Sequence, residues 1–287
     1  MTTAPAIPAS TVVLLRERES LEVYFVQRNL RTAFMKGAYV FPGGRLDELD
    51  RSTPDPTWCR GLDRVAGHWA DLSSVEAGAY AVAAIRELFE EAGVLLATDV
   101  HGQTITGRGD AAGRLAESRA AVHRGEALFR DVLRREGWLA SLDALLPLAH
   151  WVTPSDEPRR YDTRFYWAAL PAGQSPTHVA DETLGGLWLT PGEALDRNVA
   201  RDIQLPPPTM KILEDLHGLA SIRDVAAFAA ADSRPRLEPA LVRVGGVRTL
   251  VLPGDPLYPR PGEAAVDGST RFSWADGGWT SSRAADA

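Results

Sequence analysis

The segment that decides the fold runs from Arg86 to Val94 and reads RELFEEAGV. At 100° per residue, a helix over this segment turns its apolar side chains to one face and its three glutamates, Glu87, Glu90 and Glu91, to the opposite face. Like charges three or four residues apart destabilise a helix by about 0.2–0.5 kcal/mol per pair, and Arg86 can offset only part of this repulsion. The acidic face is therefore either a solvated charged surface or a site for a hard divalent cation, because oxygen ligands suit Mg²⁺ and Mn²⁺.

The residues before this segment extend the predicted helix. The apolar face continues upstream, so we expect one helix from about Val75 to Ala92. Ser73 or Ser74 is the expected N-cap, because a serine oxygen there accepts a backbone N–H that has no partner inside the helix. Gly93 is the expected end, because glycine readily adopts the left-handed conformation that terminates many helices.

Several other segments are typical of strands. β-Branched and aromatic residues predict strands at 11–17, 21–28, 150–154, 160–170 and 185–190. A hairpin is expected over residues 240–252, with Gly245 and Gly246 as its turn. The polar, Gly-rich residues after Pro261 are expected to be mobile.

The remaining segments predict helices and define the organisation of the chain. Helical patterns lie at 111–125, at 126–138, at 141–148, from Pro191 onwards, and from Thr209 to about Ala230. Residues 45–75 show no sustained periodicity of apolar residues and predict an inserted loop, with one short helix at about 62–69. Residues 105–147 predict a helical insertion. We therefore expect a main domain at 1–232, followed by a C-terminal hairpin and tail at 233–287.

Composition excludes some classes of function. The chain has 287 residues, 45% of them hydrophobic, and a formal net charge of −7, which argues against a basic face for nucleic acid. Its single cysteine, Cys59, excludes an intrachain disulfide and fits a reducing compartment. The N-terminal residues lack the pattern of a signal or membrane-spanning segment, and the last residues lack a peroxisomal address. We therefore expect a cytoplasmic protein with no membrane partner.

The acidic segment resembles a known motif. RELFEEAGV satisfies every specified position in the latter half of the Nudix box, and the glycine turn of residues 41–44, FPGG, resembles the start of that box. Gly44 and Arg86 are 42 positions apart, against fourteen in the usual box, so 28 residues are inserted, and Asp50 stands where the box has glutamate. This interrupted box resembles the branch of the Nudix hydrolase superfamily that contains the peroxisomal coenzyme A diphosphatases.

The resemblance implies a fold and a metal site. The fold is α+β, with a mixed β-sheet sandwiched between helices as an α/β/α arrangement, a helical insertion and a C-terminal helix plus hairpin. By the logic of the family, Glu87, Glu90 and Glu91 bind Mg²⁺ or Mn²⁺, with Glu90 also catalytic. Arg86 orients a box glutamate through a charged hydrogen bond, and Glu182 is the candidate general base.

The resemblance also indicates residues that bind the substrate. Gly43 and Gly44 either let a backbone carbonyl approach the metal or substrate, or form a plain tight turn. Of a coenzyme A signature before FPGG, Arg28 and Gly37 match, whereas Asn29 and Ala33 depart from it. Three arginines in or just before one predicted strand are candidates for phosphate contacts or are solvated side chains: Arg159, Arg160 and Arg164.

The expected reaction is metal-dependent hydrolysis of a diphosphate bond in a nucleoside-diphosphate-linked small molecule. Coenzyme A or acyl-coenzyme A is one expected substrate, and ADP-ribose, NADH and dinucleoside polyphosphates are alternatives, because the box sets the chemistry and the pocket selects the substrate. A non-catalytic module that binds a nucleotide is the alternative from another class. Homodimers are common in the family the sequence resembles.

Overall fold

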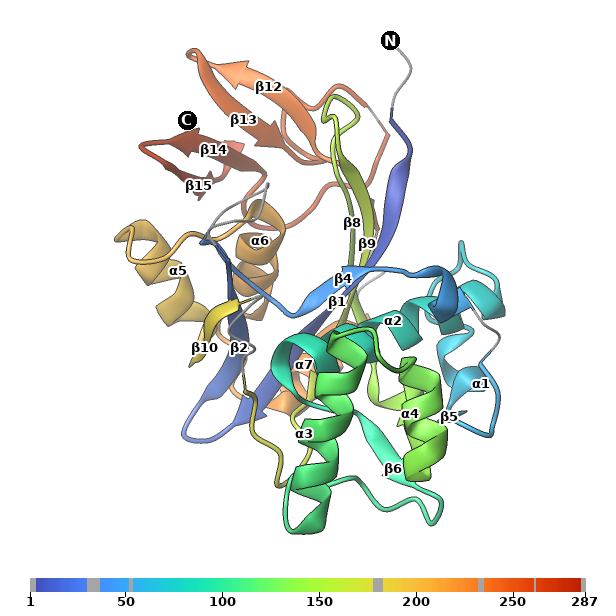
Figure 1. Ribbon diagram of the computed structural model, residues 1–287. Helices are drawn as coiled ribbons and strands as arrows, with labels where there is room; N and C mark the ends of the chain where they lie inside the picture. Colours follow the sequence, from blue (N-terminus) through green and yellow to red (C-terminus); the bar gives the residue numbers. More distant parts are fainter. Residues whose placement is uncertain are drawn as a thin grey trace.

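The computed structural model describes residues 4–29, 37–51, 54–177, 183–231, 235–260 and 262–284, and is drawn in Figure 1. A mixed sheet in the order β10-β2-β1-β9-β8-β11 forms its centre, with β3 paired to β2 and β4 paired to β1. The strands are β1 (Ala6–Glu17), β2 (Leu21–Arg28), β3 (Tyr39–Val40), β4 (Gly43–Arg45), β8 (Leu146–Val152), β9 (Arg160–Ala169), β10 (Thr183–Leu189) and β11 (Arg236–Leu237). Strand β1 runs parallel to β9 and antiparallel to β2 and β4.

Helices cover both faces of this sheet. Successive side chains of a strand point to opposite faces, so Leu14 of β1 joins the core under α2 (Ser74–Ala92), whereas Leu15 joins the core on the other side. That second core contains side chains of α5 (Pro191–Val199), α6 (Pro207–Leu216) and α7 (Ile222–Ala231). The predicted α/β/α arrangement is confirmed. In the described ranges, no helix is both long and apolar enough to cross a membrane.

The helix that carries the acidic segment has the predicted bounds. It runs from Ser74 to Ala92, and Ser73 caps it: the Ser73 hydroxyl accepts from the Glu76 N–H, and the Glu76 carboxylate accepts from the Ser73 N–H. Gly93 ends it with a φ of 67°. The apolar face is buried against β1, which fixes the orientation of the acidic face.

The predicted insertions contain more regular structure than expected. Residues 45–75 form the 3-10 turn η1 (Glu48–Arg51), β5 (Cys59–Arg60) and α1 (Leu62–Val65). Strand β5 pairs with β7 (Trp138–Ser141), which also pairs with β6 (Ala97–Asp99), so the two insertions share one small sheet. The helices α3 (Asp110–His123) and α4 (Phe129–Glu136) confirm the helical character of the second insertion.

Two helix predictions were wrong. Residues 141–148 form the 3-10 turn η2 (Leu142–Ala144) and the start of β8, because pairing with β9 outweighs the local helical pattern. The helix expected from Thr209 to Ala230 is two helices, α6 and α7. Between them, His217 has an extended backbone and Gly218 has a φ of 89°, so the helical conformation does not continue.

The C-terminal region is ordered, which corrects the prediction of a mobile tail after Pro261. The expected hairpin is present as β12 (Ala240–Val244) and β13 (Val247–Val251). The tail adds β14 (Arg271–Ala275) and β15 (Gly278–Ser282), drawn in red in Figure 1, and β14 pairs with β13. Phe272 and Trp279 are buried in the core beneath α5 and α6, so apolar burial offsets the polar composition of this tail.

Candidate active site

The glycine turn and the acidic helix lie in direct contact. Strand β4 pairs with β1, which places Gly43 opposite Thr11 and Gly44 opposite Ser10. The Gly43 N–H donates to Oε2 of Glu91 at 2.9 Å. A Cβ added to Gly44 would lie 2.4 Å from Oε1 of Glu87, so any larger residue would force that carboxylate to shift. The two parts of the interrupted box therefore meet in the folded protein.

Arg86 links the acidic residues on both sides of the insertion. Its Nη1 donates to Glu87 at 2.9 Å and to Glu90 at 3.0 Å. Its Nε and Nη2 donate to the two oxygens of Asp50 at 2.9 and 2.8 Å, and Nη2 also donates to the Arg45 carbonyl. The expected hydrogen bond from Arg86 to a box glutamate is thus present in the structure.

Asp50 is the residue whose role the sequence left open. It is 3% exposed and forms a bidentate pair with Arg86, which is 8% exposed. Such planar, two-bonded contacts fix the guanidinium in one orientation. The signal in the sequence was its position, six residues after Gly44, where the family motif has the longer glutamate.

The electrostatics of the acidic face indicate an excess of negative charge. Burial raises the pKa of the Glu87 carboxyl to about 7, with a further contribution from the charge of Glu90, while Arg86 opposes both. Burial alone would lower the pKa of Arg86, yet its hydrogen bond to Asp50 and the charge of Glu87 raise it. One arginine therefore does not neutralise these carboxylates completely, and a cation would stabilise them.

The donor chemistry of this face fits the predicted metal. Glu87, Glu90 and Glu91 offer carboxylate oxygens, the ligands that Mg²⁺ and Mn²⁺ prefer, and Glu87 is partly buried with a raised pKa. Within the described ranges, no three His, Cys, Asp or Glu side chains are already arranged around one point as a metal site. Metal binding by these residues therefore stays a prediction.

The residues predicted before FPGG are structural in part. The Arg28 N–H donates to the Ala38 carbonyl, which holds the end of β2 against the turn. Gly37 has a φ of 71°, which explains a glycine there, and its carbonyl accepts from Gln27. Glu182 and Ala33 lie outside the described residues, so the structure says nothing about the candidate base.

The predicted phosphate-binding arginines differ in their surroundings. Arg164 is 2% exposed, donates to both oxygens of Asp71 at 2.9 and 2.6 Å, and lies over the Trp69 ring. Arg160 is paired with Glu238 of the C-terminal region, and Arg159 is exposed. A phosphate contact for Arg164 stays a prediction, and the structure gives its guanidinium a carboxylate partner.

Arg119 is a further residue that sequence reasoning missed. Its Nε donates to the Glu90 carbonyl at 2.9 Å, and its Nη1 and Nη2 donate to the side chain and carbonyl of Thr177. Arg119 thus joins the C-terminal end of α2 to the segment after β9. No motif marked it, because α3 approaches α2 only through the tertiary fold.

Comparison with a solved structure identifies the fold. The crystal structure of a NUDIX hydrolase from Alicyclobacillus acidocaldarius matches 82% of this chain and 100% of its own, with a TM-score of 0.65 and 24% identity. At this identity the likeness shows the fold, which is the Nudix fold.

Comparison with families then identifies the chain. The model described as the NUDT19 Nudix domain matches residues 68–216. Acyl-coenzyme A diphosphatase NUDT19 from Gallus gallus is 32% identical over 279 residues, which cover 83% of this chain and 73% of that protein. The Homo sapiens protein of the same name is 30% identical over 276 residues, covering 84% of this chain and 73% of its own. The chain belongs to the NUDT19 family of Nudix domains and is a Nudix hydrolase.

Proposed function

We propose that this enzyme hydrolyses the diphosphate bond of coenzyme A or acyl-coenzyme A with the help of Mg²⁺ or Mn²⁺. The products would be a phosphopantetheine and an adenosine bisphosphate. The observation that carries this proposal is the convergence of Glu87, Glu90 and Glu91 on Arg86 and the glycine turn. The names of the related proteins from Gallus gallus and Homo sapiens support the choice of substrate.

The residues of the chain would act by positioning the cation and its carboxylate ligands. Glu87, Glu90 and Glu91 would hold the cation, which when bound neutralises diphosphate oxygens and lowers the pKa of a bound water. Arg86 holds the carboxylates of Glu87 and Glu90 through its Nη1, and the Gly43 N–H holds that of Glu91. These contacts fix the carboxylates before the substrate arrives, which lowers the cost of organising the site.

A panel of diphosphates tests the proposal. Coenzyme A, acetyl-coenzyme A, NADH, ADP-ribose and diadenosine polyphosphates are each incubated with enzyme and Mg²⁺ or Mn²⁺, and the products are resolved by chromatography. We expect the highest kcat/KM for coenzyme A or its acyl form, and no turnover after chelation. Preference for another member would reject the proposed substrate, and absence of cleavage in the whole panel would reject the proposed reaction.

A cytoplasmic location and a homodimer are the remaining proposals. The single cysteine, Cys59, is free and buried, which fits a reducing compartment. Cell fractionation measures the location, and light scattering measures the mass in solution. A monomeric mass across the working concentration range would reject the dimer.

A further inference from the structure

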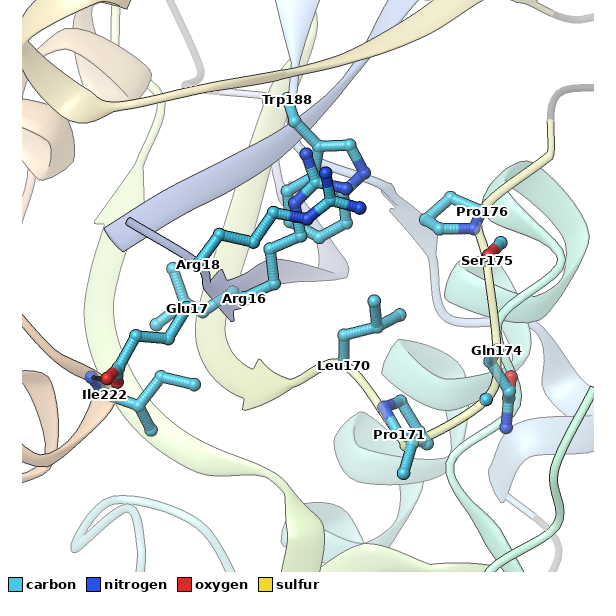
Figure 2. Close-up of a pocket in the computed structure, with 13 residues that line it drawn as sticks. Arg16, Glu17, Arg18, Leu170, Pro171, Gln174, Ser175, Pro176, Trp188 and Ile222 are labelled. Atoms are coloured by element: carbon cyan, nitrogen blue, oxygen red, sulfur yellow. Dashed lines mark hydrogen bonds between the residues drawn. The ribbon is translucent and has the colours of Figure 1, made fainter. Parts of the chain in front are cut away.

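A cavity of about 590 Å³ lies at the C-terminal end of β1. Its walls are Arg16 of β1, Arg18 of the β1–β2 turn, Trp188 of β10, residues 170–176 after β9, and Ile222 of α7. Figure 2 shows Arg16 and Arg18 extending towards Trp188, whereas Glu17 extends in the opposite direction towards Ile222. Its volume falls in the range of small-molecule sites, roughly 300–1,000 Å³.

One wall of this cavity is fixed to the acidic helix. The Thr177 N–H donates to the carbonyl of Ala92, the last residue of α2, at 2.8 Å. Arg119 bonds both Thr177 and the Glu90 carbonyl. The Gln174 side chain bonds the N–H and the carbonyl of Leu95. The segment of residues 170–177 is thus held against the C-terminal end of the helix that carries Glu90 and Glu91.

The sheet provides a second connection between the cavity and the acidic face. The Tyr24 ring lies 5.2 Å from the Trp188 ring, centroid to centroid, and the charge of Glu91 is among the causes that raise the Tyr24 pKa, after burial. Strands rise about 3.3 Å per residue, so Arg16 lies roughly 17 Å along β1 from Thr11, the partner of Gly43. The buried Tyr24 thus lies between Glu91 of the acidic face and Trp188 in the cavity wall.

The chemistry of the walls selects a planar and anionic group. The Arg16 guanidinium lies 4.2 Å from the Trp188 ring centroid and is paired with Glu22, which neutralises its charge. Glu17 accepts from the Ile222 N–H at the start of α7, so its charge is directed away from Trp188. Arg18 is exposed, and no carboxylate in the described part of the chain is paired with it. The cavity thus presents an aromatic–guanidinium stack and one uncompensated guanidinium.

We propose that this cavity binds the nucleoside arm of the diphosphate substrate. The purine stacks on the Arg16 guanidinium, which itself lies over the Trp188 ring, because bases stack favourably on guanidinium planes. The phosphate carried on the ribose pairs with Arg18, because guanidinium groups form strong charged hydrogen bonds to phosphate. This inference rests on the proposed function, and it names Arg18 as the residue that distinguishes coenzyme A from its form without the ribose 3′-phosphate.

The test compares coenzyme A with 3′-dephospho-coenzyme A. We expect the wild-type enzyme to have a KM for coenzyme A that is about tenfold or more below its KM for 3′-dephospho-coenzyme A. This is the scale of one charged hydrogen bond. The Arg18→Ala variant should lose this preference, and Arg18→Glu should reverse it. Arg197→Ala, which removes an exposed arginine of α5, is the matched control and should keep the wild-type ratio.

A binding measurement keeps the inference separate from the proposed reaction. Calorimetric titration with adenosine 3′,5′-bisphosphate and with AMP requires no turnover. Tighter binding of the bisphosphate by wild type, lost in Arg18→Ala, supports the cavity even if no diphosphate is cleaved, in which case only the proposed function fails. Equal affinity for both ligands, or bisphosphate binding unchanged in Arg18→Ala, would overturn the inference, whereas cleavage of coenzyme A would still support the reaction.

Discussion

At the scale of single residues, Asp50 and Arg86 explain how a box with a 28-residue insertion can remain assembled. The sequence shows the two halves of the motif but not their contact, because the contact joins residues 36 positions apart. Both side chains are nearly buried, and the two Asp50 oxygens accept hydrogen bonds from Arg86. A buried ion pair of this geometry costs desolvation, so its main effect is to fix the orientation of Arg86.

Removal of the carboxylate of Asp50 should therefore destabilise the protein. We expect Asp50→Ala to lower the free energy of unfolding by about 1–3 kcal/mol, because the buried Nε of Arg86 loses its acceptor while Glu87 and Glu90 still offset the charge of Arg86. Urea unfolding measures the change. The matched control is Glu48→Ala, whose side chain is 93% exposed, and it should change stability by less than about 0.5 kcal/mol. Equal stability of the two variants would contradict this account of Asp50.

Gly44 offers a second test at the same scale. A Cβ at this position would lie 2.4 Å from the Glu87 carboxylate, so Gly44→Ala should displace Glu87 and lower kcat by about tenfold or more. Gly113→Ala in α3 is the control, because its Cβ meets nothing within 4 Å and alanine favours a helix. Steady-state kinetics with coenzyme A measure both variants. Wild-type kcat in Gly44→Ala would show that Glu87 needs no space there.

At the scale of elements, the sequence predicted correctly those elements whose conformation is set by their own residues. The helix α2 was predicted with its cap and its end, because periodicity, Ser73 and Gly93 act within the helix itself. The strand β5 was not predicted, because two residues, Cys59 and Arg60, form a strand only by pairing with residues 140 and 141. Residues 141–148 were misassigned for the same reason, since pairing with β9 decides their conformation.

The cap of α2 can be tested by comparing adjacent serines. Ser73→Ala should lower the free energy of unfolding by about 1 kcal/mol, because the Glu76 N–H loses its acceptor. Ser74→Ala removes a hydroxyl one residue later, where the structure assigns no cap, and should cost less. Thermal unfolding, monitored by circular dichroism, ranks the stabilities of the two variants. The opposite order would assign the cap to Ser74, the alternative that the sequence left open.

At the scale of the whole molecule, the C-terminal residues complete the core on one face of the sheet. Their polar, Gly-rich composition predicted mobility, and composition was misleading because a few large side chains carry the packing. Phe272 is fully buried and Trp279 nearly so, in the same cluster as side chains of α5 and α6. Strand β11 also pairs with β8, so the C-terminal region extends the central sheet.

Because of this packing, we expect a substitution far from the acidic helix to lower the stability of the protein strongly. Phe272→Ala should lower the free energy of unfolding by about 3–5 kcal/mol, the usual cost of deleting a buried aromatic side chain. Trp274→Ala, two residues later on the same strand, removes a ring that is 38% exposed and should cost less. Urea unfolding of both variants measures the difference. A mobile tail would predict no loss for either one.

The central claim is that the acidic face of α2 is the catalytic centre of a diphosphatase. Its most direct test is the kcat/KM of Glu91→Gln for coenzyme A with Mg²⁺ or Mn²⁺, with Glu117→Gln as an exposed control on α3. We predict that Glu91→Gln loses about two to three orders of magnitude, the scale of removing one charged contact at a transition state, while its circular dichroism is unchanged. The control should keep wild-type activity. Undiminished turnover by Glu91→Gln would contradict the claim.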